Sequence, residues 1–508
     1  MFERRHFLKL AASASLAGVP GLGESARAQG GVEAVPFDSA LLAEMARVLA
    51  KRPYKAAATD LPDPFNNMPY DQYVGIRRRS EALIWGADTI GFALEPLHRG
   101  FLFGTPMALH IVENGLAQKL VYDASKYDFG KMTPPGAVAD IGFSGFRVLQ
   151  PREGESMAEL AIFQGASFFR SLARGQNLGT MARALAVRTA DPRGEEFPMI
   201  RAMWIERPVL ANGTLVMHAL IDSESMTGAY RFTLRPGEAT IIDTECTLFA
   251  RANVDHIGLG AMTATFLYGP IDRRRSDDLR PGVYEVNGLQ MLTGAGEWIW
   301  RPVANRENLQ ISGFIDKNPR GFGFLQRDRN FERFQDDDQH WEMRPSLWIE
   351  PIGDWGEGLV QLVEIPSDSE VNDNIIAYWR PKAAMAAGAE ASYAYRQFWC
   401  WTPPEHAPLA VVSGSRGGRG SQGKKRRFAV DFTSEMFGDA QRSLDIKPAL
   451  NAVPGTISGI RVFLSRERKT CRVFFEMDPG AEAFCEIRLM LESGGKPLSE
   501  TWLYRWTA

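Results

Sequence analysis

From about residue 88 onward, the chain consists of short apolar runs separated by turn-forming residues. Examples of these runs are PMALHIV, LVMHALI, YRFTLRP, ATIIDTECTLFA, LVQLVEI and NIIAYW, with glycine, proline, asparagine and aspartate between them. Runs of this length predict β-strands that end at turns. Many such strands bury their apolar residues by packing one sheet on another. The pattern therefore predicts an all-β protein with a large antiparallel β-sandwich.

The composition changes at residues 403–427, PPEHAPLAVVSGSRGGRGSQGKKRR, which are rich in glycine, proline and basic residues. This composition is typical of a linker or lid loop. The runs FAVDF, GIRVFLS, CRVFFEM, AFCEIRLML and ETWLYRW follow, enough strands for a small immunoglobulin-like β-sandwich. We therefore expect a large domain at 29–402, a linker or lid at 403–427 and a second domain at 428–508.

The first 28 residues have the features of a twin-arginine export signal. Arg4 and Arg5 precede a modest apolar run, and Ala26, Arg27 and Ala28 form a small-residue cleavage site. No later segment has roughly 18 uninterrupted apolar residues, the length that a membrane-spanning helix needs. We therefore expect a periplasmic protein with no stable membrane insertion.

Charge and motif content exclude several classes of function. The formal net charge is −3, from 58 basic and 61 acidic residues, so nucleic acid is not an expected partner. There is no G-x-S-x-G or H-E-x-x-H motif, and the cysteines lack metal-type spacing, so we expect no metal and no cofactor. A bridge between Cys471 and Cys485 stays open, but buried free thiols are favoured.

Tryptophan is concentrated in one part of the chain. Eight of the twelve tryptophans lie between residues 298 and 401. Flat aromatic rings stack on the C–H faces of sugars, while neighbouring carboxylates and arginines bind the hydroxyls. The alternative is that the rings fill the core of the sandwich.

Asp373 stands at the start of an apolar, aromatic run in EIPSDSEVNDNIIAYW, residues 364–379. An acid at this edge is partly desolvated, which raises its pKa towards the range of a general acid. Glycoside cleavage uses one protonated acid and a second carboxylate that activates water. The alternative is a solvated or turn-capping aspartate.

Several long motifs in order resemble the osmoregulated periplasmic glucan biosynthesis family, OpgG and OpgD, from about residue 38 to the end of the chain. The motifs are DIGFSGFRV (140–148), FQGASFFRS (163–171), GEEFP (194–198), LIDSESMTGAYRF (220–232), GEWIWRP (296–302), NPRGFGFLQRDRNF (318–331), RPSLWIEP (344–351), WGEGLVQLVEIP (355–366) and DNIIAYW (373–379). The twin-arginine signal is more similar to the OpgD branch. The resemblance implies a mutarotase-like β-sandwich followed by an immunoglobulin-like one, acting on β-1,2-linked glucan.

The resemblance also implies roles for individual residues. The family's general acid falls on Asp373, and its base falls on Glu285 in YEVNGL, where the family has aspartate. Asn287 stands where the family has a second aspartate, which is a departure from the hydrolytic relay. The residues expected to line the sugar subsites are Trp298, Trp341, Arg344, Glu350 and Trp355.

Two classes of function remain at this point. The first is an inverting endo-β-1,2-glucanase or transglycosylase with Asp373 as the acid and Glu285 as the base. The second is a non-catalytic protein that binds glucan for membrane-bound synthesis or substitution, and the Glu285 and Asn287 replacements favour it. A sugar epimerase rests on analogy of fold alone. The sequence leaves open whether the chain forms a homodimer.

Overall fold

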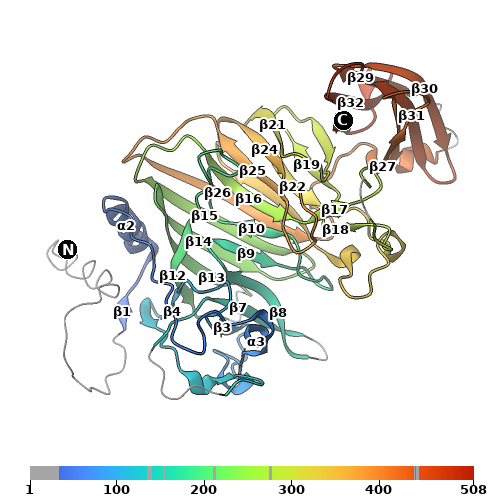
Figure 1. Cartoon of the computed structure of the whole chain (residues 1–508). Coiled ribbons are helices and arrows are strands. Elements are labelled where there is room, and N and C mark those ends of the chain that lie inside the picture. Colours follow the sequence, from blue (N-terminus) through green and yellow to red (C-terminus); the bar gives the residue numbers. More distant parts are fainter. Residues whose placement is uncertain are drawn as a thin grey trace, which may run out of the picture.

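The computed structural model describes residues 34–133, 140–152, 155–209, 213–273, 277–439, 441 and 445–508. The expected signal at 1–28 lies outside the described residues. None of the described helices is long and apolar enough to cross a membrane. The described chain folds almost entirely into strands, so the prediction of an all-β protein is confirmed (Figure 1).

One sheet of the large sandwich continues through the whole molecule. Its main path runs in the order β1 (Val35–Pro36), β5 (Leu116–Lys119), β4 (Ala108–Glu113), β12 (Met199–Glu206), β13 (Leu215–Asp222), β14 (Met226–Arg235), β15 (Thr240–Ala250), β26 (Glu390–Cys400), β23 (Ser346–Ile352), β22 (Gly321–Leu325), β19 (Gly288–Leu292), β20 (Trp298–Pro302), β34 (Thr501–Thr507), β32 (Phe484–Ser493) and β29 (Lys447–Val453). A short strand, β33 (Lys496–Pro497), pairs with β32.

The second sheet packs against the first. Its order is β21 (Gln310–Lys317), β24 (Glu357–Glu364), β25 (Ile375–Pro381), β16 (Ile257–Ala264), β10 (Met181–Arg183), β9 (Phe168–Ser171), β8 (Glu155–Gln164), β7 (Gly145–Arg152) and β3 (Ala93–Leu97), and β11 (Ala186–Val187) pairs with β16. Phe169 of β9 lies 5.3 Å from Phe232 of β14 and 6.5 Å from Trp399 of β26, between ring centroids. The large core therefore lies between the two sheets, where alternating side chains of both meet.

Smaller elements join or cover the sheets. They are the pairs β2 (Arg77–Arg78) with β6 (Tyr127–Asp128) and β17 (Phe266–Tyr268) with β18 (Val283–Tyr284), the helices α2 (Ser39–Ala50) and α3 (Tyr70–Gly75), and the 3₁₀ turns Ser80–Ala82, Ala124–Lys126, Phe331–Arg333, Trp341–Met343 and Glu435–Phe437. Asp38 caps α2 by accepting from the amide of Leu41 at 2.7 Å. Leu42 and Ala46 turn its apolar face onto the strands of the first sheet.

The C-terminal region forms a small sandwich at one end of the molecule, drawn in dark red in Figure 1. Its separate sheet has the order β27 (Val411–Arg419), β28 (Arg426–Thr433), β31 (Thr470–Asp478) and β30 (Thr456–Ser465). It packs on β32 and β34, with Trp502 6.2 Å from Phe428. Cys471 and Cys485 are buried free thiols in this core.

The two sandwiches share a sheet rather than a flexible connection. Strand β20 of the large sandwich pairs in parallel with β34, with Trp300 opposite Trp502. The segment 403–427, expected as a linker or lid, contains β27 and the start of β28, which pair along their lengths. The expected linker or lid therefore contains a strand at Val411–Arg419, because backbone pairing with β28 makes a strand of a glycine-rich segment whose composition is typical of a loop. The domain bounds at 403 and 428 stay a prediction.

Candidate functional site

Two acids from separate loops meet at one end of the large sandwich. Asp373 stands two residues before β25, and Glu285 lies between β18 and β19. The Thr263 hydroxyl donates to Asp373 Oδ2 at 2.5 Å, and the Thr265 hydroxyl lies 3.4 Å from Asp373 Oδ1. The Thr265 amide donates to Glu285 Oε2 at 3.2 Å. Because Thr265 bonds to both acids, the structure brings the two predicted residues together.

Asn374 fixes the backbone beside Asp373. Its Oδ1 accepts from the amide of Phe266 at 2.8 Å, and its Nδ2 donates to the carbonyl of Phe266 at 3.0 Å. The same Nδ2 donates to the carbonyl of Ile365 at 3.1 Å. A buried asparagine that bonds in this way replaces ladder hydrogen bonds at the point where β16 and β25 separate. The divergence of the strands leaves room for the side chain of Asp373.

Burial raises the pKa of both acids. It raises the pKa of Glu285 to about 7, and the neighbouring charge of Asp373 adds to the rise while Arg344 opposes it. Burial also raises the pKa of Asp373, against the hydrogen bond from Thr263 and the charge of Arg170. Two adjacent buried carboxyls resist ionising together, so the pair holds a proton at a pH where exposed carboxylates have lost theirs. The pair thus offers both a hydrogen-bond donor and acceptors.

Two arginines supply positive charge at this pair. Arg344 stands just before β23 and donates to Gln339 Oε1 at 2.8 Å. Arg170 lies on β9 and acts on both acids through its charge. Arg344 was predicted from the sequence, whereas Arg170 was not, although it stands in the motif FQGASFFRS. We call Glu285, Asp373, Arg170 and Arg344 the carboxyl-pair site.

Arg280 holds three loops beside this site. It donates to Asp278 Oδ2 at 2.7 Å, to Asp336 Oδ2 at 2.7 Å and to Glu370 Oε2 at 2.6 Å. The indole of Trp341 also donates to Asp336 Oδ2, at 2.9 Å, and only 3% of Trp341 is exposed. Trp341 therefore lies near the site but contributes to its wall, because its polar edge faces Asp336 and its ring is covered.

The other predicted subsite residues lie at the opposite end of the strands. Trp298 pairs with Leu292 at the end of β19 that is farther from Glu285, and its ring lies 6.1 Å from that of Trp348. Glu350 accepts from the Trp348 indole at 3.2 Å. Trp355 is buried and donates to the carbonyl of Ala394 at 3.2 Å. The structure does not bring these three residues to the carboxyl pair. Trp298 and Trp355 are buried in the core instead, which was the alternative interpretation of the tryptophans.

The described residues contain no group of three or more histidine, cysteine or acidic side chains that could hold a metal ion. The site presents two neighbouring carboxyls and two guanidinium groups. Such groups bind hydroxyls by directional hydrogen bonds, as sugar ligands require.

Comparison with known proteins identifies the family. Residues 37–506 match the family described as "Periplasmic glucan biosynthesis protein, MdoG". The chain is 41% identical to glucans biosynthesis protein G of Rhodopseudomonas palustris (strain BisA53) over 500 residues, which cover 97% of this chain and 98% of the relative. It is 41% identical to glucans biosynthesis protein G of Vibrio cholerae (strain O395), covering 93% and 87%. The corresponding protein of Bradyrhizobium diazoefficiens is 40% identical, covering 99% and 100%.

Solved structures are less similar. A galactose mutarotase related enzyme from Lactobacillus acidophilus is 7% identical, with 48% of this chain and 98% of that one covered, at a TM-score of 0.22. A likeness of this size carries no argument about the site.

These comparisons correct one expectation. The glycoside hydrolase or transglycosylase expected from Asp373 and Glu285 is wrong, because the family and the relatives are described by the biosynthesis of glucans and not by their cleavage. A periplasmic location fits the family description, while twin-arginine export, the OpgD branch and the β-1,2 linkage stay predictions. The chain belongs to the MdoG family of periplasmic glucan biosynthesis proteins.

Proposed function

We propose that the protein is a non-catalytic glucan-binding protein, which holds β-1,2-linked glucan at the carboxyl-pair site during periplasmic glucan biosynthesis. The observation that supports this proposal most directly is the meeting of Glu285 and Asp373 at Thr265, where the charges of Arg170 and Arg344 act on them. The family's description supplies the class of ligand. Its members take part in making a glucan, and a role that holds the chain without cutting it fits this description.

The charges of the site suit a neutral sugar chain. A carboxyl pair that keeps one proton donates one hydrogen bond and accepts several, and the guanidinium groups of Arg170 and Arg344 donate more. Sugar hydroxyls both donate and accept, so they can satisfy all of these groups at once. The pair is costly to bury without such partners, which gives a bound glucan a favourable contribution.

Calorimetric titration of the protein with linear β-1,2-gluco-oligosaccharides tests the proposal. We expect Arg344→Ala to weaken binding at least tenfold, since a hydrogen bond to a charged group contributes about 1.5–3 kcal/mol. The matched control is Arg231→Ala, because Arg231 is a half-exposed arginine paired with Glu245 on strands far from the site. The control should bind as the wild type does.

The same mixtures should be resolved by mass after long incubation. Oligosaccharides of unchanged length support a binding protein. New product lengths would contradict the non-catalytic role, and equal affinities of wild type and Arg344→Ala would remove the carboxyl-pair site from glucan binding.

A further inference from the structure

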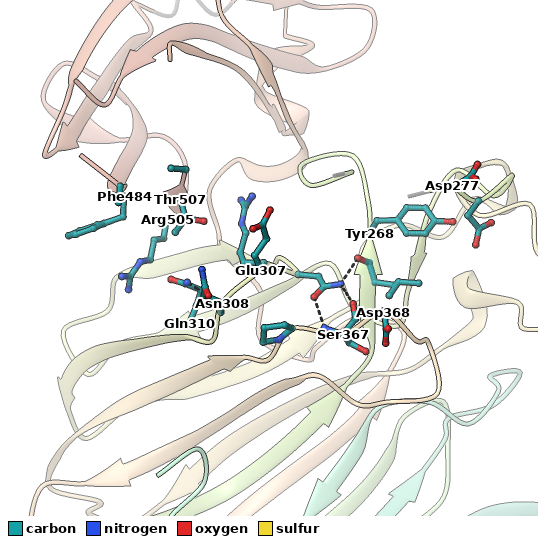
Figure 2. Close-up of a pocket in the computed structure, with 17 residues that line it drawn as sticks. Tyr268, Asp277, Glu307, Asn308, Gln310, Ser367, Asp368, Phe484, Arg505 and Thr507 are labelled. Atoms are coloured by element: carbon teal, nitrogen blue, oxygen red, sulfur yellow. Dashed lines mark hydrogen bonds between the residues drawn. The ribbon is translucent and has the colours of Figure 1, made fainter. Parts of the chain in front are cut away.

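A cavity lies where the two sandwiches meet, apart from the four residues of the carboxyl-pair site (Figure 2). Its volume is about 980 Å³, at the upper end of the roughly 300–1,000 Å³ typical of small-ligand sites. The large sandwich contributes residues 267–268, 277–278, 305–308, 310 and 366–368, and the small one contributes residues 483–484, 505 and 507–508. We call it the junction cavity.

The junction cavity has an aromatic end and a polar middle. Figure 2 shows Phe484 and Arg505 on one side, Tyr268 and Asp368 on the other, and Asn308 between them. Phe484 is 40% exposed, and the guanidinium of Arg505 lies 5.1 Å from its ring centroid. An exposed ring beside polar side chains is an arrangement that binds the two kinds of surface that a sugar presents.

Polar groups of the cavity are available for a ligand. No hydrogen bond or ion pair joins the side chains of Asn308 and Asp368 to another residue of the described ranges, whereas the Gln310 amide donates to the Asn308 carbonyl at 3.2 Å. Their amide and carboxylate can therefore meet hydroxyls without first giving up a partner.

The charge of the lining disfavours an anionic ligand. Four acids and two arginines line the cavity: Asp277, Asp278, Glu307, Asp368, Arg306 and Arg505. Two of these charges are already paired: Arg306 lies 3.3 Å from the buried Asp272, and Asp278 accepts from Arg280 at 2.7 Å. The remaining acids still outnumber Arg505. An excess of carboxylates repels phosphate and other anions, and a neutral polyhydroxylated chain meets no such penalty.

One loop separates the junction cavity from the carboxyl-pair site. It connects β24 to β25, and its Ser367 and Asp368 face the cavity while Asp373 stands at its other end in the pair. Asn305 fixes the cavity side, because its Nδ2 donates to the Ser367 carbonyl at 2.7 Å and its Oδ1 accepts from the Ser367 amide at 3.0 Å. Thr265 fixes the other side through the Asn372 carbonyl, at 3.2 Å. The two sites therefore lie at opposite ends of one loop.

We propose that the junction cavity is a second glucan-binding site, which takes sugar units of the chain that is held at the carboxyl-pair site. The inference rests on the proposed function, since it takes the ligand from there. In this proposal, residues of both sandwiches bind one glucan chain at the boundary between them. A glucan long enough to reach Phe484 therefore binds more tightly than a shorter oligomer does.

The test compares a linear β-1,2-linked glucose trisaccharide with a much longer linear oligomer, by calorimetric titration. We expect the wild type to bind the longer oligomer more tightly. Phe484→Ala should weaken binding of the longer oligomer about twofold to tenfold, the range that a stacked ring contributes, and leave the trisaccharide unaffected. Asn308→Ala is the second variant, with the same expected direction, and the thermal midpoint of each variant verifies that it is folded.

Phe463→Ala is the matched control, because Phe463 is an exposed phenylalanine of the small sandwich, 51% exposed, that does not line the cavity. Equal affinity of Phe484→Ala, Asn308→Ala and wild type for the longer oligomer would overturn the second site, while weaker binding of both ligands to Arg344→Ala would leave the proposed function standing. Weakening by Phe484→Ala with no effect of Arg344→Ala would support the cavity as a glucan site and overturn the role of the carboxyl pair. No binding of either oligomer by the wild type would overturn both.

Discussion

Glu285 and Glu500 are both buried glutamates, but their surroundings are opposite. Glu500, at the boundary of the two sandwiches, accepts from both terminal nitrogens of Arg327 at 2.7 and 3.1 Å, from Gln290 at 3.0 Å and from the amide of Val412 at 2.7 Å. Glu285 accepts from the Thr265 amide at 3.2 Å and lies beside a second acid. The carboxylate of Glu500 therefore has hydrogen-bond donors of the fold around it, whereas Glu285 has a second carboxyl beside it.

The difference separates a structural charge from a functional one. Arg327 also lies over the ring of Trp300, 3.6 Å from its centroid, so the pair with Glu500 fastens the large sandwich to β27 and β34. Such an arrangement satisfies every group that it buries. A buried carboxyl pair that lacks such hydrogen bonds lowers the stability of the fold. Strongly shifted pKa values, such as that of Glu285, are concentrated at functional sites.

The largest effect on stability should follow from removing the carboxylate of Glu500. Glu500→Ala leaves the guanidinium of Arg327 partly buried with no carboxylate, so we expect the free energy of unfolding to fall by about 3–5 kcal/mol. Urea unfolding measures it. Glu435→Ala is the control, because Glu435 is 86% exposed in its ion pair with Lys469 and should contribute about 1 kcal/mol or less. A similar loss of unfolding free energy in both variants would mean that the buried ion pair of Glu500 contributes no more than the exposed pair of Glu435.

Replacing Glu285, the buried acid with fewer hydrogen-bond partners, should have a smaller effect on stability. The folded protein raises the pKa of Glu285 from 4.5 to about 7, so within this pH range the folded state binds more protons than the unfolded state. Stability therefore falls as pH rises from 4.5 to about 7. Glu285→Gln has no proton to lose, and we expect it to lessen this fall by about 1–3 kcal/mol. Urea midpoints over a pH series provide the measurement, and parallel curves for variant and wild type would refute the shift.

The same contrast shows what the sequence could predict. Asp373 was a candidate from the sequence, because an acid directly before an apolar run lies at the edge of a buried strand. Glu285 and Arg344 were found through the resemblance to the family. The sequence could not show that Trp298 lies at the end of β19 that is farther from Glu285, since an aromatic residue next to a glycine-rich turn has the same local pattern at either end of a sandwich, and only strand register decides which end it occupies.

Contacts between distant loops could not be predicted at all. Arg280 meets Glu370 across 90 positions of the chain, and Arg327 meets Glu500 across 173. No local spacing encodes such pairs, because they depend on where the loops of a completed sandwich converge. The strand β27 was hidden for a related reason: the partner that orders it, β28, supplies hydrogen bonds that its own glycine-rich composition does not suggest.

The smallest effect on stability should come from replacing Arg280. Like Glu500, Arg280 has ion-pair partners within the fold, but its side chain lies nearer the surface. Its side chain is 19% exposed, and Asp336 keeps hydrogen bonds from the Trp341 indole and the amides of Asp338 and Gln339, so Arg280→Ala should lower the free energy of unfolding by about 1–2 kcal/mol. The local effect should be larger, because Arg280 joins the loop of Glu370 to that of Asp336. We expect faster amide hydrogen exchange at residues 366–374 and 334–343 than in wild type, with rates in β14 unchanged. Uniform acceleration would mean that Arg280 supports the whole fold, whereas unchanged rates at both loops would mean that other contacts hold the wall of the carboxyl-pair site.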